Sequence, residues 1–104
     1  MKVPEVIFTI DSRRYRIAVD FNILLQIEAE LGSLNTALER LKTGDWTLTE
    51  LVQMLHIMIS TVDDQLDFSV LGQKIVNAGA GHFIAPLTRF LTLPLEVVLL
   101  LRTS

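Results

Sequence analysis

The chain has 104 residues, contains no cysteine and carries a formal net charge of −3. A chain of this length forms one domain, so we expect residues 1–104 to be a single domain. The absence of cysteine excludes disulfides, thiol nucleophiles and cysteine metal sites, and the mildly acidic balance argues against broad electrostatic attraction to nucleic acid.

Hydrophobic residues make up 50% of the chain and charged residues only 20%. The first fraction is at the top of the ordinary range and the second is below average. Because a small domain has much surface for its volume, we expect part of this apolar content to lie at an interface. The composition therefore favours a protein that works through partners.

The first predicted element is a β-hairpin within residues 3–19. Apolar residues alternate in two runs on either side of a polar turn at residues 11–14: Val6, Phe8, Ile10 and then Tyr15, Ile17, Val19. Alternation of this kind indicates half-buried strands. Closing the turn between Ile10 and Tyr15 would place Phe8 opposite Ile17 and Val6 opposite Val19, with every apolar pair on one face.

The remaining residues, 20–104, are predicted to be helical. Asp20 and Gly32 delimit a first helix from about Phe21, and Ser33 and Gly44 delimit a second.

The third predicted helix is the most apolar. It starts with the capping-box pattern of Thr47 and Glu50. Its apolar residues surround most of its circumference: Leu48, Leu51, Val52, Met54, Leu55, Ile57, Met58, Ile59 and Val62. A helix of this kind is buried, so we expect it to lie at the centre of the fold.

Three further helices are predicted after the central one. Asp67 caps a helix that ends at Gly79, a fifth helix covers roughly 86–91, and Pro94 begins a last helix over 95–102. The predicted fold class is α+β: an N-terminal antiparallel β-hairpin followed by a bundle of about five short helices around a central apolar helix.

No pattern in the chain indicates catalysis. Neither His56 nor His82 has a set of partners, and the acidic stretch from Asp63 has Phe68 and Lys74 where an EF-hand needs Gly and Glu. The glycine-rich phosphate-binding motifs are absent. We therefore expect a protein that is not an enzyme, with no catalytic residue, no metal site and no cofactor.

Membrane and nucleic-acid partners are not expected either. No run reaches about eighteen uncharged apolar residues, and the start MKVPEV lacks the apolar region of a signal peptide, so we expect a cytosolic protein. The three arginines of RRYR are interpreted as a solvated turn, which is the more common role of such a cluster. Phosphate binding needs several cations acting together, and the acidic balance of the chain gives them little long-range attraction to nucleic acid.

The stretch FTIDSRRYRIAVDFNILLQIEAELGSLNTALERLKTGDWTLTELVQML resembles the tail assembly chaperones of long-tailed phages, especially the small family of prophages and gene transfer agents. The resemblance runs from about Ile7 to Gly81 and rests on structural positions: Asp11, Tyr15, Phe21, Glu28, Leu31, Gly32, Leu41, Gly44, Thr47 and Leu51. It implies a protein in the cytoplasm of a bacterial host that binds the tape measure protein, a long helical rod, and keeps it soluble during tail assembly.

Two alternatives remain open at this stage. The first is a structural tail component of the virion, since some relatives of this kind have been labelled tail tube proteins. The second is a small nucleic-acid-binding regulator.

The predicted partner-binding residues are Leu95, Val98, Leu99 and Leu101. The segment 95–101 is apolar on all sides of a two-turn helix, whereas a helix at the edge of a domain buries one face on its own chain. Burying one Leu or Val side chain is worth roughly 1.5–3 kcal/mol, so exposing several is unfavourable. We expect the outer face to contact either the tape measure protein, or another tail protein, or a second copy in a homo-oligomer.

Overall fold

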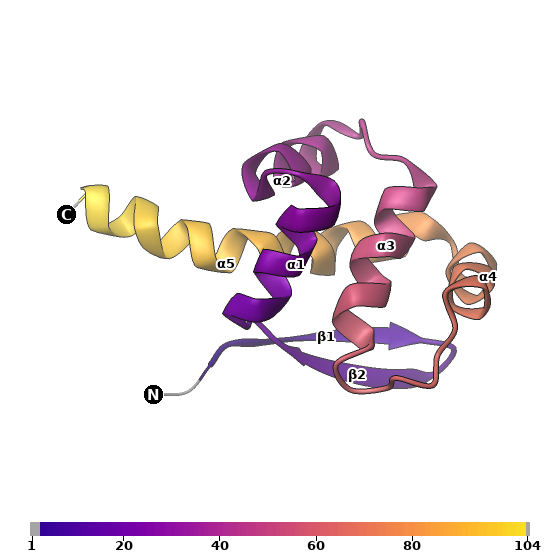
Figure 1. The fold of residues 1–104 in the computed structure, drawn as a ribbon. Coiled ribbons are helices and arrows are strands. Elements are labelled where there is room, and N and C mark those ends of the chain that lie inside the picture. The colour runs from indigo at the N-terminus through magenta and orange to yellow at the C-terminus, as the bar shows by residue number, and fades with distance from the viewer. Residues whose placement is uncertain (1–2, 104) are drawn as a thin grey trace.

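A computed structural model describes the backbone of residues 3–103 and the side chains of residues 3–95. Strands β1 (Glu5–Ile10) and β2 (Arg13–Ala18) form an antiparallel hairpin on one side of the molecule, and the helices lie on the other (Figure 1). The helices are α1 (Phe21–Leu31), α2 (Leu34–Thr43), α3 (Leu48–Ile59), α4 (Phe68–Ala78) and α5 (Ile84–Thr103), with a short 3₁₀ helix, η1 (Ala80–Phe83), before α5. The α+β fold predicted from the sequence is confirmed.

The hairpin turn is shorter than predicted. Asp11 and Ser12 form it alone, with φ angles of 56° and 67°. Positive φ at both central residues defines the type I′ turn, whose twist matches that of the strands. Phe8 therefore pairs with Tyr15 and not with Ile17.

The predicted register was wrong by two residues, since Val6 pairs with Ile17 and not with Val19. Side chains alternate along a strand with a period of two, so a shift of two residues leaves the same side chains facing inward. The predicted inner face is buried for this reason, with Val19 partly buried at its edge.

Helix α3 forms the middle of the core, as its apolar circumference predicts. Seven of its side chains are buried: Leu51, Val52, Met54, Leu55, Ile57, Met58 and Ile59. The prediction was wrong for Leu48 and Val62, which are exposed. Leu48 is the first residue of α3, and Val62 lies beyond its last residue, Ile59.

The helix boundaries follow local capping chemistry. The side chains of Ser33, Thr47 and Asp67 accept hydrogen bonds from backbone N–H groups of the helices they precede. Asp20 occupies the N-cap position of α1, but its side chain makes no capping hydrogen bond. Gly44 adopts the left-handed conformation that ends α2.

The two separate helices predicted around Pro94 are one helix. Helix α5 runs from Ile84 to Thr103 with Pro94 inside it. Proline removes one backbone hydrogen bond and disfavours a helix interior by about 3 kcal/mol. The first half of α5 buries Leu87, Phe90 and Leu91, and the ring centroid of Phe90 lies 6.4 Å from that of Phe8. This packing offsets the effect of Pro94.

Candidate partner-binding surface

The structure places the predicted partner-binding residues in the second half of α5. Leu95 is partly buried and packs against the core. The side chains of Val98, Leu99 and Leu101 lie outside the described residues, so their role stays a prediction. The backbone of α5 continues past the other helices at one end of the molecule (Figure 1).

A second apolar surface, which sequence reasoning missed, lies between α3 and α4. We call it the α3–α4 groove, and it encloses about 230 Å³. Eight residues line it: Leu48, Thr49 and Val52 from α3, and Phe68, Ser69, Gly72, Gln73 and Val76 from α4. None of these lining residues is charged, so an apolar side chain can enter the groove without removing water from an ion.

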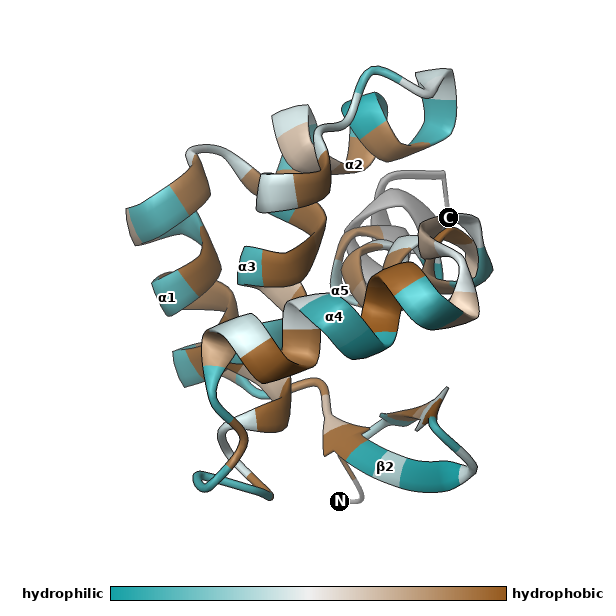
Figure 2. Ribbon diagram, turned by 90° about the vertical axis from the view of Figure 1, so that its right-hand side faces the viewer, coloured by the Kyte–Doolittle hydropathy of each residue, from teal (hydrophilic) through white to brown (hydrophobic). Residues whose placement is uncertain are grey.

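The groove exists because α4 turns only one narrow face to the core. Leu71 and Ile75, four residues apart, are its only buried side chains. Gly72 and Val76 follow them by one position and therefore lie about 100° around the helix, towards α3. Figure 2 shows hydrophobic and hydrophilic positions alternating along α4, which lies at the front of that view. The signal in the sequence was Val76, an apolar residue of the groove lining that does not fit the Leu71–Ile75 stripe.

Polar contacts outside the groove hold α4 in place. The ammonium of Lys74 donates a hydrogen bond to Asp11 in the hairpin turn, with 2.8 Å between Nζ and Oδ2. This hydrogen bond lowers the pKa of Asp11 and raises the pKa of Lys74, because each charged group stabilises the other. Arg13, beside them in β2, pairs with Asp63 in the loop before α4 at 3.3 Å.

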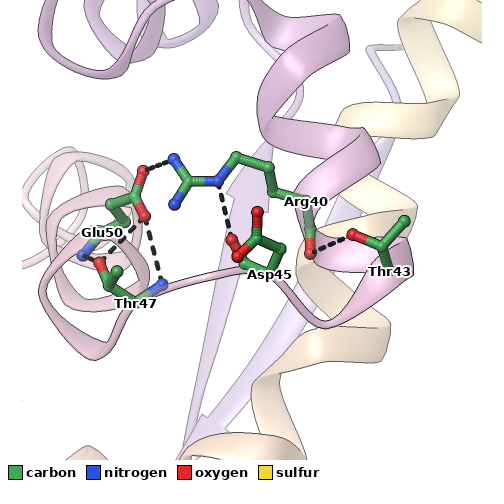
Figure 3. A network of polar contacts seen from close by, with 5 residues as sticks. All are labelled: Arg40, Thr43, Asp45, Thr47 and Glu50. Carbon is green, nitrogen blue, oxygen red and sulfur yellow. Dashed lines mark hydrogen bonds and ion pairs between the residues drawn. The ribbon is translucent and has the colours of Figure 1, made fainter.

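A polar network fixes the start of α3, next to Leu48 and Thr49 of the groove (Figure 3). Glu50 accepts hydrogen bonds from the backbone N–H and the hydroxyl of Thr47, at 3.2 and 2.9 Å. Its second carboxylate oxygen pairs with Arg40 of α2, whose Nε donates to the carbonyl oxygen of Asp45 at 2.8 Å. The capping box predicted from Thr47 and Glu50 is therefore confirmed, and it also ties α2 to α3.

The two histidines lie in different surroundings. His56 is partly buried; its Nε2 lies 3.2 Å from the carbonyl oxygen of Leu66, and its ring packs edge-on against Phe68 with 5.5 Å between centroids. His56 thus positions Phe68 at one end of the groove. His82 is exposed after α4, with its ring beside Gly79.

The described part of the chain has neither a metal-binding cluster nor a membrane-spanning helix. It contains no group of three or more His, Asp or Glu residues that could hold a metal ion. Over the same residues, no helix has both the length and the apolar content needed to cross a membrane.

Comparisons with family models, with curated proteins and with solved structures found no match to this chain.

Proposed function

We propose that the chain is a tail assembly chaperone of a phage, prophage or gene transfer agent, which binds the tape measure protein in the cytoplasm of the bacterial host. The sequence resemblance from Ile7 to Gly81 supports this proposal. The structural observation that carries it is apolar surface left open to partners, namely the uncharged α3–α4 groove. The apolar sequence of segment 95–101 adds to it.

The physical basis is burial of the partner's apolar stripe. A long helical rod exposes side chains at i, i+3, i+4 and i+7, and such a stripe aggregates with other rods in water. An apolar surface on a small protein binds this stripe in the helix-in-groove manner. Each buried Leu or Val contributes roughly 1.5–3 kcal/mol to the free energy of binding. Many copies of the chaperone bound along one rod would cover its apolar stripe and keep the rod soluble. No chemical step is needed, and the proposed protein is not an enzyme.

The test uses the predicted partner-binding residues. Val98→Asp combined with Leu101→Asp is expected to weaken capture of the tape measure protein in co-expression pull-downs, because a carboxylate must lose its water at the contact. The matched control is Val62→Asp with Val70→Asp, two exposed valines that do not line the α3–α4 groove. If the folded test variant captures the partner as strongly as the control variant does, segment 95–101 is not the binding site.

A structural tail component is the second candidate, because subunits of a tail must also bury apolar surface against one another. Presence of the chain in purified particles would favour it. A very long coiled-coil-rich reading frame directly downstream would favour the chaperone.

The regulator is not proposed. The nearest carboxylate oxygen to Arg16, from Glu5, lies 3.8 Å away, and Arg13 pairs with Asp63. These pairs reduce the positive charge that the turn offers to phosphates.

A further inference from the structure

We infer that the outer edge of strand β2, the edge not paired with β1, binds an acidic, extended segment of another protein. The segment adds to the hairpin as a third, antiparallel strand. The inference concerns a strand-shaped partner, and it does not rest on the proposed binding of a helical rod.

The hydrogen bonds of the hairpin show which backbone groups face this edge. The N–H of Val19 donates to the carbonyl oxygen of Pro4 at 2.8 Å, so these two residues form a hydrogen-bonded pair. In an antiparallel ladder such pairs alternate with pairs whose backbone groups point outward. Counted along the ladder from Val19, Arg16 and Arg14 belong to pairs of the outward kind. Their N–H and C=O groups therefore face the outer edge of β2.

This edge is unpaired in the part of the chain that the structure describes. The sheet there consists of β1 and β2, and no backbone hydrogen bond from a loop or helix reaches Arg14 or Arg16. Both arginine side chains are exposed, and Figure 2 shows hydrophilic positions along β2 at the bottom of that view. A row of unpaired N–H and C=O groups is a template for a further strand.

Positive charge along the same edge is not fully balanced. The two other cations near the hairpin turn each pair with an aspartate, at 3.3 and 2.8 Å. Arg16 lies 3.8 Å from Glu5, which is longer than a charge-assisted hydrogen bond, and its side chain is 67% exposed. No ion pair within residues 3–95 includes Arg14. The edge therefore offers two guanidinium groups to a partner.

The spacing of these arginines defines the partner's sequence pattern. Arg14 and Arg16 are two residues apart in a strand, so their side chains leave the same face about 7 Å apart. Residues directly opposite in an antiparallel pair have Cβ atoms about 4.5–5.5 Å apart, and opposite charges there stabilise the sheet. The matching partner carries Asp or Glu at every second residue.

A second copy of this chain fits the edge less well. Another β2 would place Arg14 opposite Arg16, or one of them opposite itself, and like charges directly opposite each other destabilise a sheet. Strand β1 of a second copy carries one carboxylate, Glu5, for two arginines.

Nucleic acid also matches only part of the edge. Phosphate oxygens accept hydrogen bonds from N–H and guanidinium groups, but they donate none to the C=O groups of Arg14 and Arg16. A peptide strand supplies both donors and acceptors, and its acidic side chains supply the charge. The combination of an unpaired strand edge and paired arginines therefore favours an acidic peptide.

The probe is the peptide Val-Glu-Val-Glu-Val with acetyl and amide ends, titrated into the isotope-labelled full chain at physiological ionic strength. We expect the amide signals of Arg14 and Arg16 to shift and to gain protection from exchange with water. The matched peptide Val-Gln-Val-Gln-Val is expected to bind at least about tenfold more weakly, because it carries no carboxylate.

N-methylated probes separate strand addition from simple attraction of charges. Methylation of both glutamate nitrogens keeps the charge and removes the N–H groups that face β2, so binding should be lost. Methylation of the central valine nitrogen is the control. Its N–H points away from β2, and binding should persist.

Protein variants test the arginines. Arg14→Gln with Arg16→Gln is expected to weaken binding of the glutamate peptide at least about tenfold. The control, Lys42→Gln with Arg89→Gln, also removes two positive charges, at exposed positions of α2 and α5, and should bind as wild type does. Circular dichroism confirms that both variants are folded.

Four results would overturn the inference. Equal binding of the glutamate and glutamine peptides would mean that the arginines only keep other strands away from the edge. Full binding of the peptide methylated at glutamate would exclude an added strand. A folded Arg14 and Arg16 variant that binds like the control would exclude this site. Tighter binding of a short oligothymidylate at Arg14 and Arg16 would assign the edge to nucleic acid.

Discussion

Helices α3 and α4 have nearly the same length, 12 and 11 residues, yet they use their apolar residues differently. Seven side chains of α3 are buried, whereas α4 buries only Leu71 and Ile75. Each helix packs on three other elements, α3 on α1, β2 and α4, and α4 on α3, β1 and η1. Helix α4 nevertheless leaves three large apolar side chains exposed, those of Phe68, Val70 and Val76. Apolar side chains therefore stabilise the core in α3, whereas much of the apolar content of α4 stays exposed.

The largest expected effect contrasts one residue from each helix. Leu55→Ala removes a fully buried side chain of α3 and is expected to destabilise the protein by about 2–5 kcal/mol. Val76→Ala in α4 is expected to change the free energy of unfolding by less than about 0.5 kcal/mol, because that side chain is half exposed. Urea denaturation measures both. Equal losses of stability would contradict the division between a core helix and a surface helix.

The next effect concerns the start of α3. Glu50→Ala removes the reciprocal cap with Thr47 and the ion pair with Arg40, and it is expected to destabilise the protein by about 2 kcal/mol. Glu39→Ala, at an exposed position of α2, is the control and should stay within about 0.5 kcal/mol of wild type. Similar unfolding midpoints for the two variants would mean that the network in Figure 3 contributes nothing to stability.

A smaller effect of opposite sign is expected in α4. Gly72→Ala adds a Cβ that would lie 3.7 Å from Cγ1 of Val52, an ordinary contact. Alanine in place of glycine in a helix interior stabilises by roughly 0.5–1 kcal/mol. The unfolding midpoint of this variant should therefore rise above that of wild type. A fall in the midpoint would show that this part of the groove has no room for a methyl group.

The smallest effect is the pH dependence of the Lys74–Asp11 pair. The lowered pKa of Asp11 gives a stabilising contribution that is present above the ordinary value of 3.8 and is lost as pH falls through the lowered value. The raised pKa of Lys74 gives one that is present below 10.5 and is lost as pH rises through the raised value. Solvent reaches both charged groups and screens their attraction, so the contribution of this pair to stability is small.

Lys74→Met tests this pair, because it keeps most of the side-chain stem and removes the charge. Its unfolding midpoint should fall slightly below that of wild type at neutral pH, and the difference should shrink in acid and in strong alkali. Lys42→Met, at an exposed position in α2, is the control. A difference that persists unchanged in acid would assign the effect to lost packing and not to the ion pair.

The sequence predicted features that depend on near neighbours. The alternation of Val6, Phe8 and Ile10 identified the buried face of the hairpin, and Thr47 with Glu50 identified the start of α3. It did not predict the register, because the polar residues 11–14 allow a turn of four residues or of two. Both turns bury the same side chains, and nothing local indicated that Ser12 adopts a positive φ.

Features set by distant contacts were not predicted. Pro94 suggested a new helix, but the burial of Leu87, Phe90 and Leu91 keeps α5 continuous through it. The α3–α4 groove depends on how two helices meet, which the apolar pattern of either helix alone does not encode. Leu95 was assigned to a partner, and the structure places it partly against the core of its own chain.

The most direct test of the proposed function is the solubility of a phage tape measure protein that is produced together with this chain. The measurement is the soluble fraction of that protein when it is produced alone, with the wild-type chain, or with the Val98→Asp and Leu101→Asp variant. We expect the wild-type chain to keep the tape measure protein in the soluble fraction and to co-purify with it, and the folded variant to do so much less. A tape measure protein that stays equally insoluble with and without the wild-type chain would contradict the account.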